Sequence, residues 1–173
     1  YLANKILNQN MINSSSSWID IGSYYGGLQS IIKNEIPDLK IILCDFNHQL
    51  CRSYINLFKQ FPNYKHIFPK DAIKIKSLDE IEKGSFVYLP ASNYQNIMNC
   101  NIDLLTNFFS FGEMNRETFN NYYYNITKSK IKNIYLTNRF VSSPFFEKIY
   151  DSDLNLFDYL NSEYDQVYFD IFP

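Results

Sequence analysis

An apolar segment that ends in a carboxylate and runs straight into glycines is the feature that most constrains the fold of this chain. The stretch Trp18–Gly27 (WIDIGSYYGG) holds three of the five glycines in 173 residues. Glycine adopts left-handed backbone conformations without a steric penalty, so this spacing predicts a tight turn between a buried strand and a helix. A second apolar segment, residues 40–46 (KIILCDF), also reaches an acid, Asp45. A strand, a turn, a helix and a second strand form the first unit of a parallel sheet.

Strand-like and helix-like segments alternate along the rest of the chain. We expect strands at residues 18–21, 40–46, 65–72, 85–90, 102–109, 133–139 and 166–172. Apolar residues at helical spacing predict helices over 1–10, 27–36 and 47–61, and a further helix that Asn115 caps. Because buried strands alternate with amphipathic helices, the predicted fold is a doubly wound α/β domain with a mainly parallel sheet.

Length and composition bound the remaining possibilities. The length fits a single domain over residues 1–173. We expect this domain to be part of a longer chain, with residues 1–17 forming the end of a preceding helix and a loop. A net charge of −2 does not favour a nucleic-acid partner, and no stretch is apolar enough to span a membrane. Three cysteines without a CxxC spacing indicate reduced thiols and a cytoplasmic protein. Two histidines make a histidine-based metal site improbable, and we expect no metal. The oligomeric state is not indicated.

Polar residues follow the expected strands at their carboxyl ends. They are Gly22–Gly27, Asp45, Asp71, residues 107–113, and Asn138 with Arg139. In a doubly wound sheet, ligands bind outside the carboxyl ends of the strands, where the strand order reverses. We therefore expect these residues to form one site.

Asp45 and Tyr24 indicate what kind of ligand such a site would take. Asp45 lies 23 positions after Gly22, close to the spacing at which an acid binds the ribose hydroxyls of a nucleotide. The other interpretation of Asp45 is an acid stabilised by the dipole of the following helix. Tyr24 takes the place of the middle glycine of a dinucleotide fingerprint, where a side chain obstructs a pyrophosphate, and no GK[ST] motif occurs. The prediction is a ligand with a ribose and no pyrophosphate, for which S-adenosylmethionine is the obvious candidate.

The same residues resemble a known family. WIDIGSYYGGL followed by CDF resembles the first two cofactor motifs of class I S-adenosylmethionine-dependent methyltransferases. The stretches VYLPASNYQNI, IDLLTNFFSFGEMNRETFNNYYYNI and YLTNR resemble the bacterial sugar O-methyltransferase family, so the likeness covers residues 18–139. It implies a Rossmann-like methyltransferase fold and an enzyme that methylates a hydroxyl of a sugar or glycan precursor. That family usually has glycine at the position of Tyr24, so the alternative is a non-catalytic binding module with a degenerate cofactor loop.

The resemblance also implies roles for individual residues. Asp20 would orient the cofactor loop or meet the methionine amino group, Asp45 would hold the ribose, and Asp71 would contact the adenine. The implied cofactor-binding residues are Asp20, Gly22, Ser23, Gly26, Gly27, Asp45, Phe46, Asp71, Asn107 and Phe108.

Glu113, Asn138 and Arg139 would face the acceptor as the catalytic residues. Glu113 has three interpretations: the base that removes the hydroxyl proton, a hydrogen-bond partner of the substrate, or an acid placed against the dipole of the next helix. Arg139 would bind an anionic group of the acceptor or form an ion pair with an acid such as Glu113. A nicotinamide-dependent oxidoreductase is a third functional class, disfavoured by Tyr24 and by the lack of a Tyr-x-x-x-Lys pair.

Overall fold

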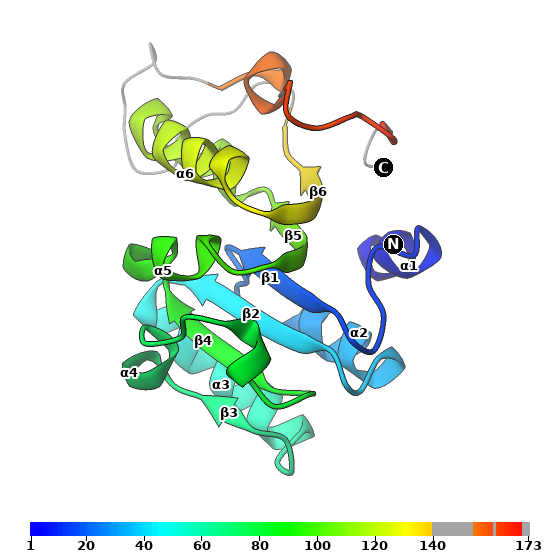
Figure 1. Ribbon diagram of the computed structural model, residues 1–173, viewed down its shortest axis with the longest axis vertical. Helices are drawn as coiled ribbons and strands as arrows, with labels where there is room; N and C mark the ends of the chain where they lie inside the picture. Colours follow the sequence, from blue (N-terminus) through cyan, green and yellow to red (C-terminus); the bar gives the residue numbers. More distant parts are fainter. Residues whose placement is uncertain (140–153, 161, 171–173) are drawn as a thin grey trace.

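The computed structural model describes residues 1–139, 154–160 and 162–170 (Figure 1). Within this part of the chain, six parallel strands form one sheet in the order β3-β4-β2-β1-β5-β6. The strands are β1 (Ser17–Ile21), β2 (Lys40–Asp45), β3 (His66–Ile67), β4 (Phe86–Pro90), β5 (Ile102–Phe108) and β6 (Ile131–Thr137). The predicted doubly wound α/β fold with a parallel sheet is confirmed.

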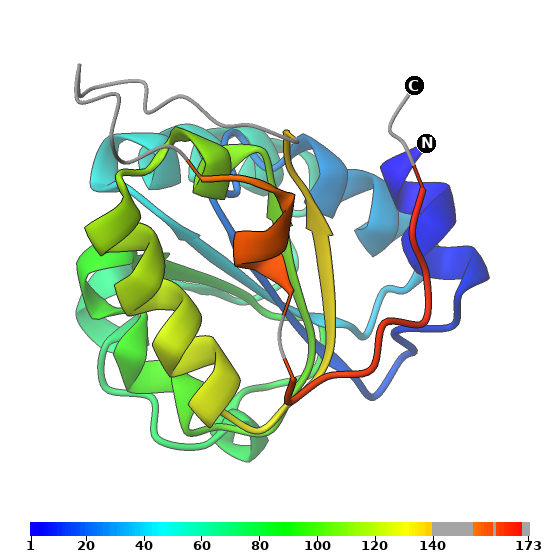
Figure 2. The same cartoon turned by 90° about the horizontal axis from the view of Figure 1, so that it is seen from above.

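Helices cover both faces of this sheet (Figures 1 and 2). They are α1 (Leu2–Asn8), α2 (Gly27–Glu35), α3 (Asn47–Gln60), α4 (Pro69–Ala72), α5 (Gln95–Met98) and α6 (Arg116–Lys128). Trp18 of β1 packs in a core cluster with residues of α1, α2 and α3, whereas its neighbour Ile19 packs in a second cluster with residues of α4, α5 and α6. The central strands are buried on both faces, which explains their predominantly apolar sequences.

The strand order reverses at β1. Strands β2, β3 and β4 lie on one side of β1, and the later strands β5 and β6 lie on the other side. β1 pairs with β2 on one edge and with β5 on the other edge. The register places Ile21 opposite both Cys44 and Asn107, so the turn that follows β1 lies between the carboxyl ends of β2 and β5. This is the place at which doubly wound sheets bind ligands.

Two predicted strands differ from the structure: one is much shorter, and the other is not formed over its described residues. The strand expected at 65–72 is reduced to His66–Ile67, because Pro69 occupies the first turn of α4, where its fixed φ favours a helix. Asp71 therefore lies on a helix and does not follow a strand end. Residues 166–170 form no strand, and Val167 is 90 % exposed, so the alternating apolar pattern there has no core to pack against. Residues 171–172 of that prediction lie outside the described residues.

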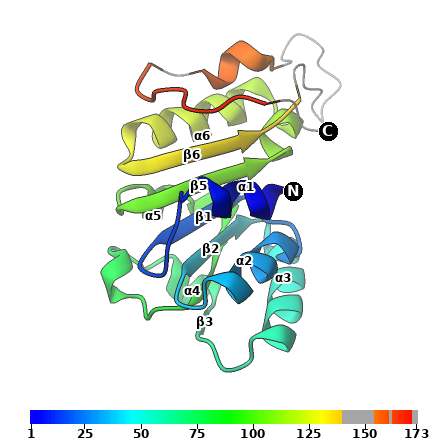
Figure 3. The ribbon, with the colours of Figure 1, turned by 90° about the vertical axis from the view of Figure 1, so that its right-hand side faces the viewer.

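The C-terminal part of the chain lies beside the edge strand β6. The short helix η5 (Leu156–Tyr159) and residues 162–170 run along β6 and reach α1 (Figure 3). The Tyr164 hydroxyl donates to the Ile131 carbonyl at 3.0 Å, and the Lys5 ammonium donates to the Tyr168 hydroxyl. In the described part of the chain, no helix is long and apolar enough to cross a membrane.

Candidate functional site

Gly22 makes the turn after β1 and brings it against the loop that follows β5. Its φ is +79°, and its N–H donates to the Cys44 carbonyl at 2.8 Å. A Cβ added at Gly22 would lie 2.3 Å from the Ser110 Oγ and 2.6 Å from the Ser110 Cβ. Both the backbone conformation and the lack of space therefore require glycine here.

Tyr24 occupies a left-handed backbone position, which glycine adopts without strain. Its φ is +52°, and its side chain is turned outward and is 57 % exposed. Its N–H donates to Asp45 Oδ2 at 2.8 Å, and its carbonyl accepts from Ser53 Oγ at 2.6 Å. These two bonds hold a conformation that costs a non-glycine residue about 1–2 kcal/mol.

Tyr25 covers the start of α2. Gly26 has a φ of +81° and precedes the first turn of this helix, where free N–H groups attract anions. An added Cβ on Gly27 would lie 2.5 Å from the hydroxyl and ring of Tyr25. The Tyr25 ring therefore occupies the space directly over the first residue of α2.

Asp45 ends β2 and faces the turn. Its carboxylate accepts from the Tyr24 N–H at 2.8 Å and from the Phe46 N–H at 2.7 Å. Burial raises the pKa of Asp45, and the two backbone donors oppose that rise. A carboxylate has about four acceptor sites, so these two bonds leave acceptor capacity for hydroxyl donors. The neighbouring Phe46 is 60 % exposed and stacks on His48 with ring centres 5.9 Å apart.

Asp20 is directed into the protein interior and away from the turn. Its carboxylate accepts from Thr106 Oγ1 at 2.6 Å and from Gln29 Nε2, and Trp18 Nε1 donates in turn to Thr106 Oγ1 at 2.7 Å. Burial raises the pKa of Asp20 to about 7. Of the two roles predicted for Asp20, this arrangement favours orienting the loop over contacting a ligand.

Asn107 joins the ends of β1, β5 and β6. Its Nδ2 donates to the Ile21 carbonyl at 2.8 Å and to Ser110 Oγ at 2.5 Å. Its Oδ1 accepts from the Phe111 N–H at 3.0 Å and from Asn138 Nδ2 at 3.2 Å. The side chain of Asn107 has thus used both donors and both acceptor sites, so it positions the surrounding loops and has no capacity left for a cofactor.

The predicted acceptor residues lie in different surroundings. Asn138 is fixed between Asn107 and the Gly112 N–H, which donates to Asn138 Oδ1 at 3.1 Å. Glu113 ends the short helix η3 (Ser110–Glu113), and both Glu113 and Arg139 are exposed. The predicted ion pair between Glu113 and Arg139 is not among the ion pairs of the described residues.

Two predicted cofactor residues lie apart from the turn. Phe108 packs its ring edge to face with Tyr135, with ring centres 5.6 Å apart, in the core of the α1–α3 face. Asp71 is exposed on α4 and pairs with Lys74 at 2.8 Å, which lowers the pKa of Asp71. The structure therefore brings together Gly22, Asp45 and Asn107, and it leaves Asp71 in a local ion pair.

The sequence pattern predicts no individual role for Ser23. It also does not reveal Ser110 as a partner of Asn107, or Gln29 and Thr106 as partners of Asp20. Ser23 Oγ is buried and has no hydrogen-bond partner among the described residues. A buried hydroxyl left unpaired costs about 1–3 kcal/mol, so a ligand group that reached Ser23 would recover that cost. Ser23 and the spare acceptor sites of Asp45 fit an alcohol-rich ligand at the turn, whereas the Tyr25 ring would have to move away from α2.

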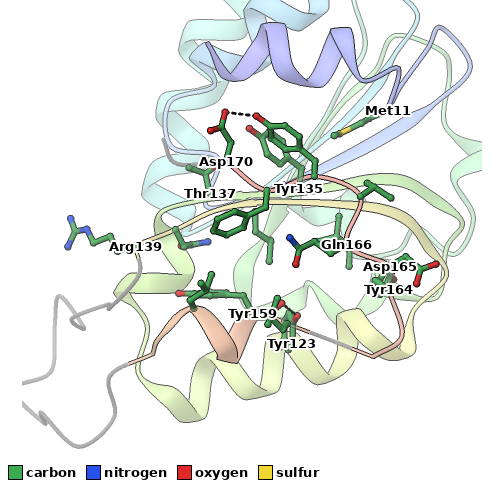
Figure 4. Close-up of a pocket in the computed structure, with 18 of the residues that line it drawn as sticks. Met11, Tyr123, Tyr135, Thr137, Arg139, Tyr159, Tyr164, Asp165, Gln166 and Asp170 are labelled. Atoms are coloured by element: carbon green, nitrogen blue, oxygen red, sulfur yellow. Dashed lines mark hydrogen bonds between the residues drawn. The ribbon is translucent and has the colours of Figure 1, made fainter. Parts of the chain in front are cut away.

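A cavity lies elsewhere, beyond the edge strand β6. This cavity of about 440 Å³ is bounded by β6, Tyr123 of α6, η5 and residues 164–170 (Figure 4). Of the predicted site residues, Asn138 and Arg139 line it. Asn138 also bonds Asn107, so one side chain links this cavity with the turn after β1.

Comparison with known proteins assigns no family. A scan against protein-family models matched none of them, and a search of curated proteins found no match to the chain.

Proposed function

We propose that this chain is an S-adenosylmethionine-dependent O-methyltransferase domain that methylates a hydroxyl group of a sugar or glycan precursor. The observation that supports it most is the position of Asp45. This carboxylate ends the strand next to β1, lies at the left-handed turn through its bond to the Tyr24 N–H, and keeps acceptor sites for a vicinal diol.

The turn favours this cofactor class over dinucleotides. A pyrophosphate needs close approach to the backbone at the middle position of the turn, and Tyr24 carries a side chain where a dinucleotide fingerprint has glycine. In the proposal, Gly22 and Ser23 line the methionine end of the cofactor, and Asp45 accepts from the two ribose hydroxyls. The cofactor, when bound, supplies an electrophilic methyl group on a sulfonium sulfur.

The residues of the chain then have to position the acceptor and take its proton. The acceptor hydroxyl loses a proton as its oxygen is methylated, so a base near it accelerates the reaction. Asn138 is an amide with its oxygen already bonded to the Gly112 N–H, which leaves it a positioning role. Glu113 is an exposed carboxylate at the end of the loop that follows β5, and the proposal assigns it the proton.

Calorimetric titration with S-adenosylmethionine and S-adenosylhomocysteine tests the proposal, with NADH for comparison. We expect both adenosyl ligands to bind and NADH to give no heat. Asp45→Asn should weaken binding by roughly 10- to 100-fold, because hydrogen bonds to a charged acceptor are lost. Asp79→Asn, an exposed acid on the short helix η1 (Leu78–Glu80), is the matched control. Heat from NADH, or no heat from either adenosyl ligand, would overturn the proposal.

A non-catalytic binding module is the second candidate, and the position of Tyr25 favours it. The ring over Gly27 fills the space in which the start of α2 would meet a carboxylate. This candidate predicts no transfer of a labelled methyl group to glycan acceptors even where S-adenosylhomocysteine binds. A labelled product that disappears in Glu113→Gln would exclude it.

A further inference from the structure

The cavity beyond β6 has the size and walls of a small-molecule site. Its volume of about 440 Å³ falls within the range of roughly 300–1,000 Å³ that is usual for ligand pockets. Seven of its lining residues are tyrosine or phenylalanine. They come from the N-terminal segment, α6, β6, η5 and residues 164–170, so rings from distant parts of the chain gather around one space (Figure 4).

Several of these rings are fixed in place by their own hydroxyl groups. The Tyr123 hydroxyl donates to the Tyr159 carbonyl, and the Tyr164 hydroxyl donates to the Ile131 carbonyl at 3.0 Å. The Tyr168 hydroxyl donates to Asp170 Oδ2 at 2.6 Å. With the hydroxyls engaged in this way, the rings offer apolar faces and edges to an occupant, at little cost in side-chain entropy.

Anionic ligands are poorly served by this cavity. Among the described lining residues Arg139 is the one arginine or lysine, and its side chain points away from the cavity (Figure 4). Of the two acids that line the cavity, Asp170 pairs with Lys5 at 3.4 Å, and Lys5 also lies over the Tyr168 ring at 4.5 Å. The other acid, Asp165, is exposed and is not among the ion pairs of the described residues. Among the described lining residues, an anion would find no cationic group directed into the cavity. A cation could pair with the exposed Asp165 or compete with Lys5 for Asp170, and this is the alternative that a cationic probe has to test.

The amide of Gln166 lies at the wall of this cavity. Gln166 lines the cavity, is exposed, and makes no side-chain hydrogen bond with any described residue. An amide offers two donors and one acceptor oxygen without charge, which matches the hydroxyl groups of an uncharged sugar. Aromatic faces next to such a polar group match the apolar faces and hydroxyl edges of a sugar ring.

We propose that the cavity between β6 and residues 164–170 binds an uncharged sugar residue, with Gln166 as a hydrogen-bonding residue. Its further assignment as the acceptor site rests on the proposed methyl transfer. Asn138 supports that assignment, since it lines the cavity and bonds Asn107 at the turn after β1. The sugar binding itself does not depend on the methyl transfer.

Saturation-transfer NMR on the intact chain tests the site with three probes: methyl glycosides of neutral hexoses, hexuronic acids and choline. We expect saturation of the neutral glycosides only. Gln166→Ala should weaken their binding roughly three- to tenfold, the usual effect of losing one neutral hydrogen bond. Gln60→Ala removes a similar exposed amide from α3, away from the cavity, and should leave binding unchanged.

The outcomes separate the sugar site from the cofactor. Preferred binding of the uronic acid or choline, no binding of any probe at millimolar concentration, or equal effects of the two variants would each overturn the sugar site. S-adenosylhomocysteine is titrated separately into the same samples. Sugar binding without adenosyl binding would leave the cavity assignment standing and remove the methyltransferase, whereas the reverse result would do the opposite.

Discussion

Replacing the buried acid Asp20 by asparagine is expected to stabilise the protein at neutral pH. Burial raises the pKa of Asp20 from 3.8 to about 7. Between these two values the unfolded chain has released the proton and the folded chain still holds it. The free energy of unfolding therefore falls as the pH rises from about 4 to about 7. A difference of about three pKa units corresponds to about 4 kcal/mol.

Asparagine satisfies the surroundings of Asp20 without a charge. Its Oδ1 can accept from Thr106 Oγ1, which is held in place by Trp18 Nε1. Gln29 Oε1 is buried with no partner among the described residues, so an amide flip of Gln29 would let it accept from the new Nδ2. Asp20→Asn thus resembles the native protein with Asp20 protonated. Compared with the native protein at the same pH, the variant should be equally stable below pH 4 and about 4 kcal/mol more stable above pH 7.

Urea unfolding of both proteins at intervals from pH 4 to pH 8 measures this difference. With a slope of about 2 kcal/mol per molar urea, the two midpoints should separate by about 2 M at pH 8. Asp71→Asn is the control, because Lys74 lowers the pKa of Asp71 and its contribution changes only below about pH 4. A variant less stable than the native protein at pH 8, or a stability difference that does not change with pH, would refute the reasoning.

Three further predictions concern the turn and the opposite end of the sheet. Gly22→Ala should destabilise the fold by about 2–5 kcal/mol, the sum of backbone strain and the overlap with Ser110. In a double-mutant cycle measured by denaturation, Gly22→Ala combined with Ser110→Gly should lose less unfolding free energy than the two single variants together, and additive losses would contradict the overlap. Tyr24→Gly relieves the strain at φ +52° but adds unfolded-state entropy, so its melting temperature should stay within a few degrees of the native value while S-adenosylhomocysteine affinity rises. Lys33 is buried, and its Nζ donates hydrogen bonds to the Leu39 and Gly84 carbonyls at 2.7 and 2.6 Å. Because burial lowers the pKa of Lys33 to about 7, the free energy of unfolding of the native protein relative to Lys33→Met should rise from pH 7 to pH 10.5, and a difference that does not change with pH would contradict this.

The central part of the fold could be predicted because its strands are buried on both faces. WIDI and KIILCD read as strands since every position needs an apolar side chain or an internally bonded polar one. The same reading is right only for His66–Ile67 within residues 65–72, because Pro69 begins a helix there. It fails again at 166–170, where the strand-like pattern has no neighbouring layer to bury it.

The candidate site was predictable to the extent that strand ends determine it. Gly22 and Asp45 follow neighbouring strands, so parallel pairing alone brings them together. The inward direction of Asp20 depends on Thr106, 86 positions away, and no spacing rule connects the two. The gathering of rings around Gln166 likewise depends on how residues 164–170 pass β6, a path that local sequence does not specify.

The two amides Asn107 and Asn138 have a consequence for the order in which ligands would bind. Asn107 bonds the Ile21 carbonyl, one residue before Gly22, and Asn138 bonds Asn107 while lining the cavity. An occupant that displaces Asn138 breaks a bond on which the position of the turn depends. By thermodynamic linkage, a ligand at the turn would then change the affinity of the cavity by the same factor by which a cavity ligand changes the affinity of the turn. Binding at the turn after β1 and binding in the cavity beside β6 would then be cooperative, and the two side-chain amides would couple them.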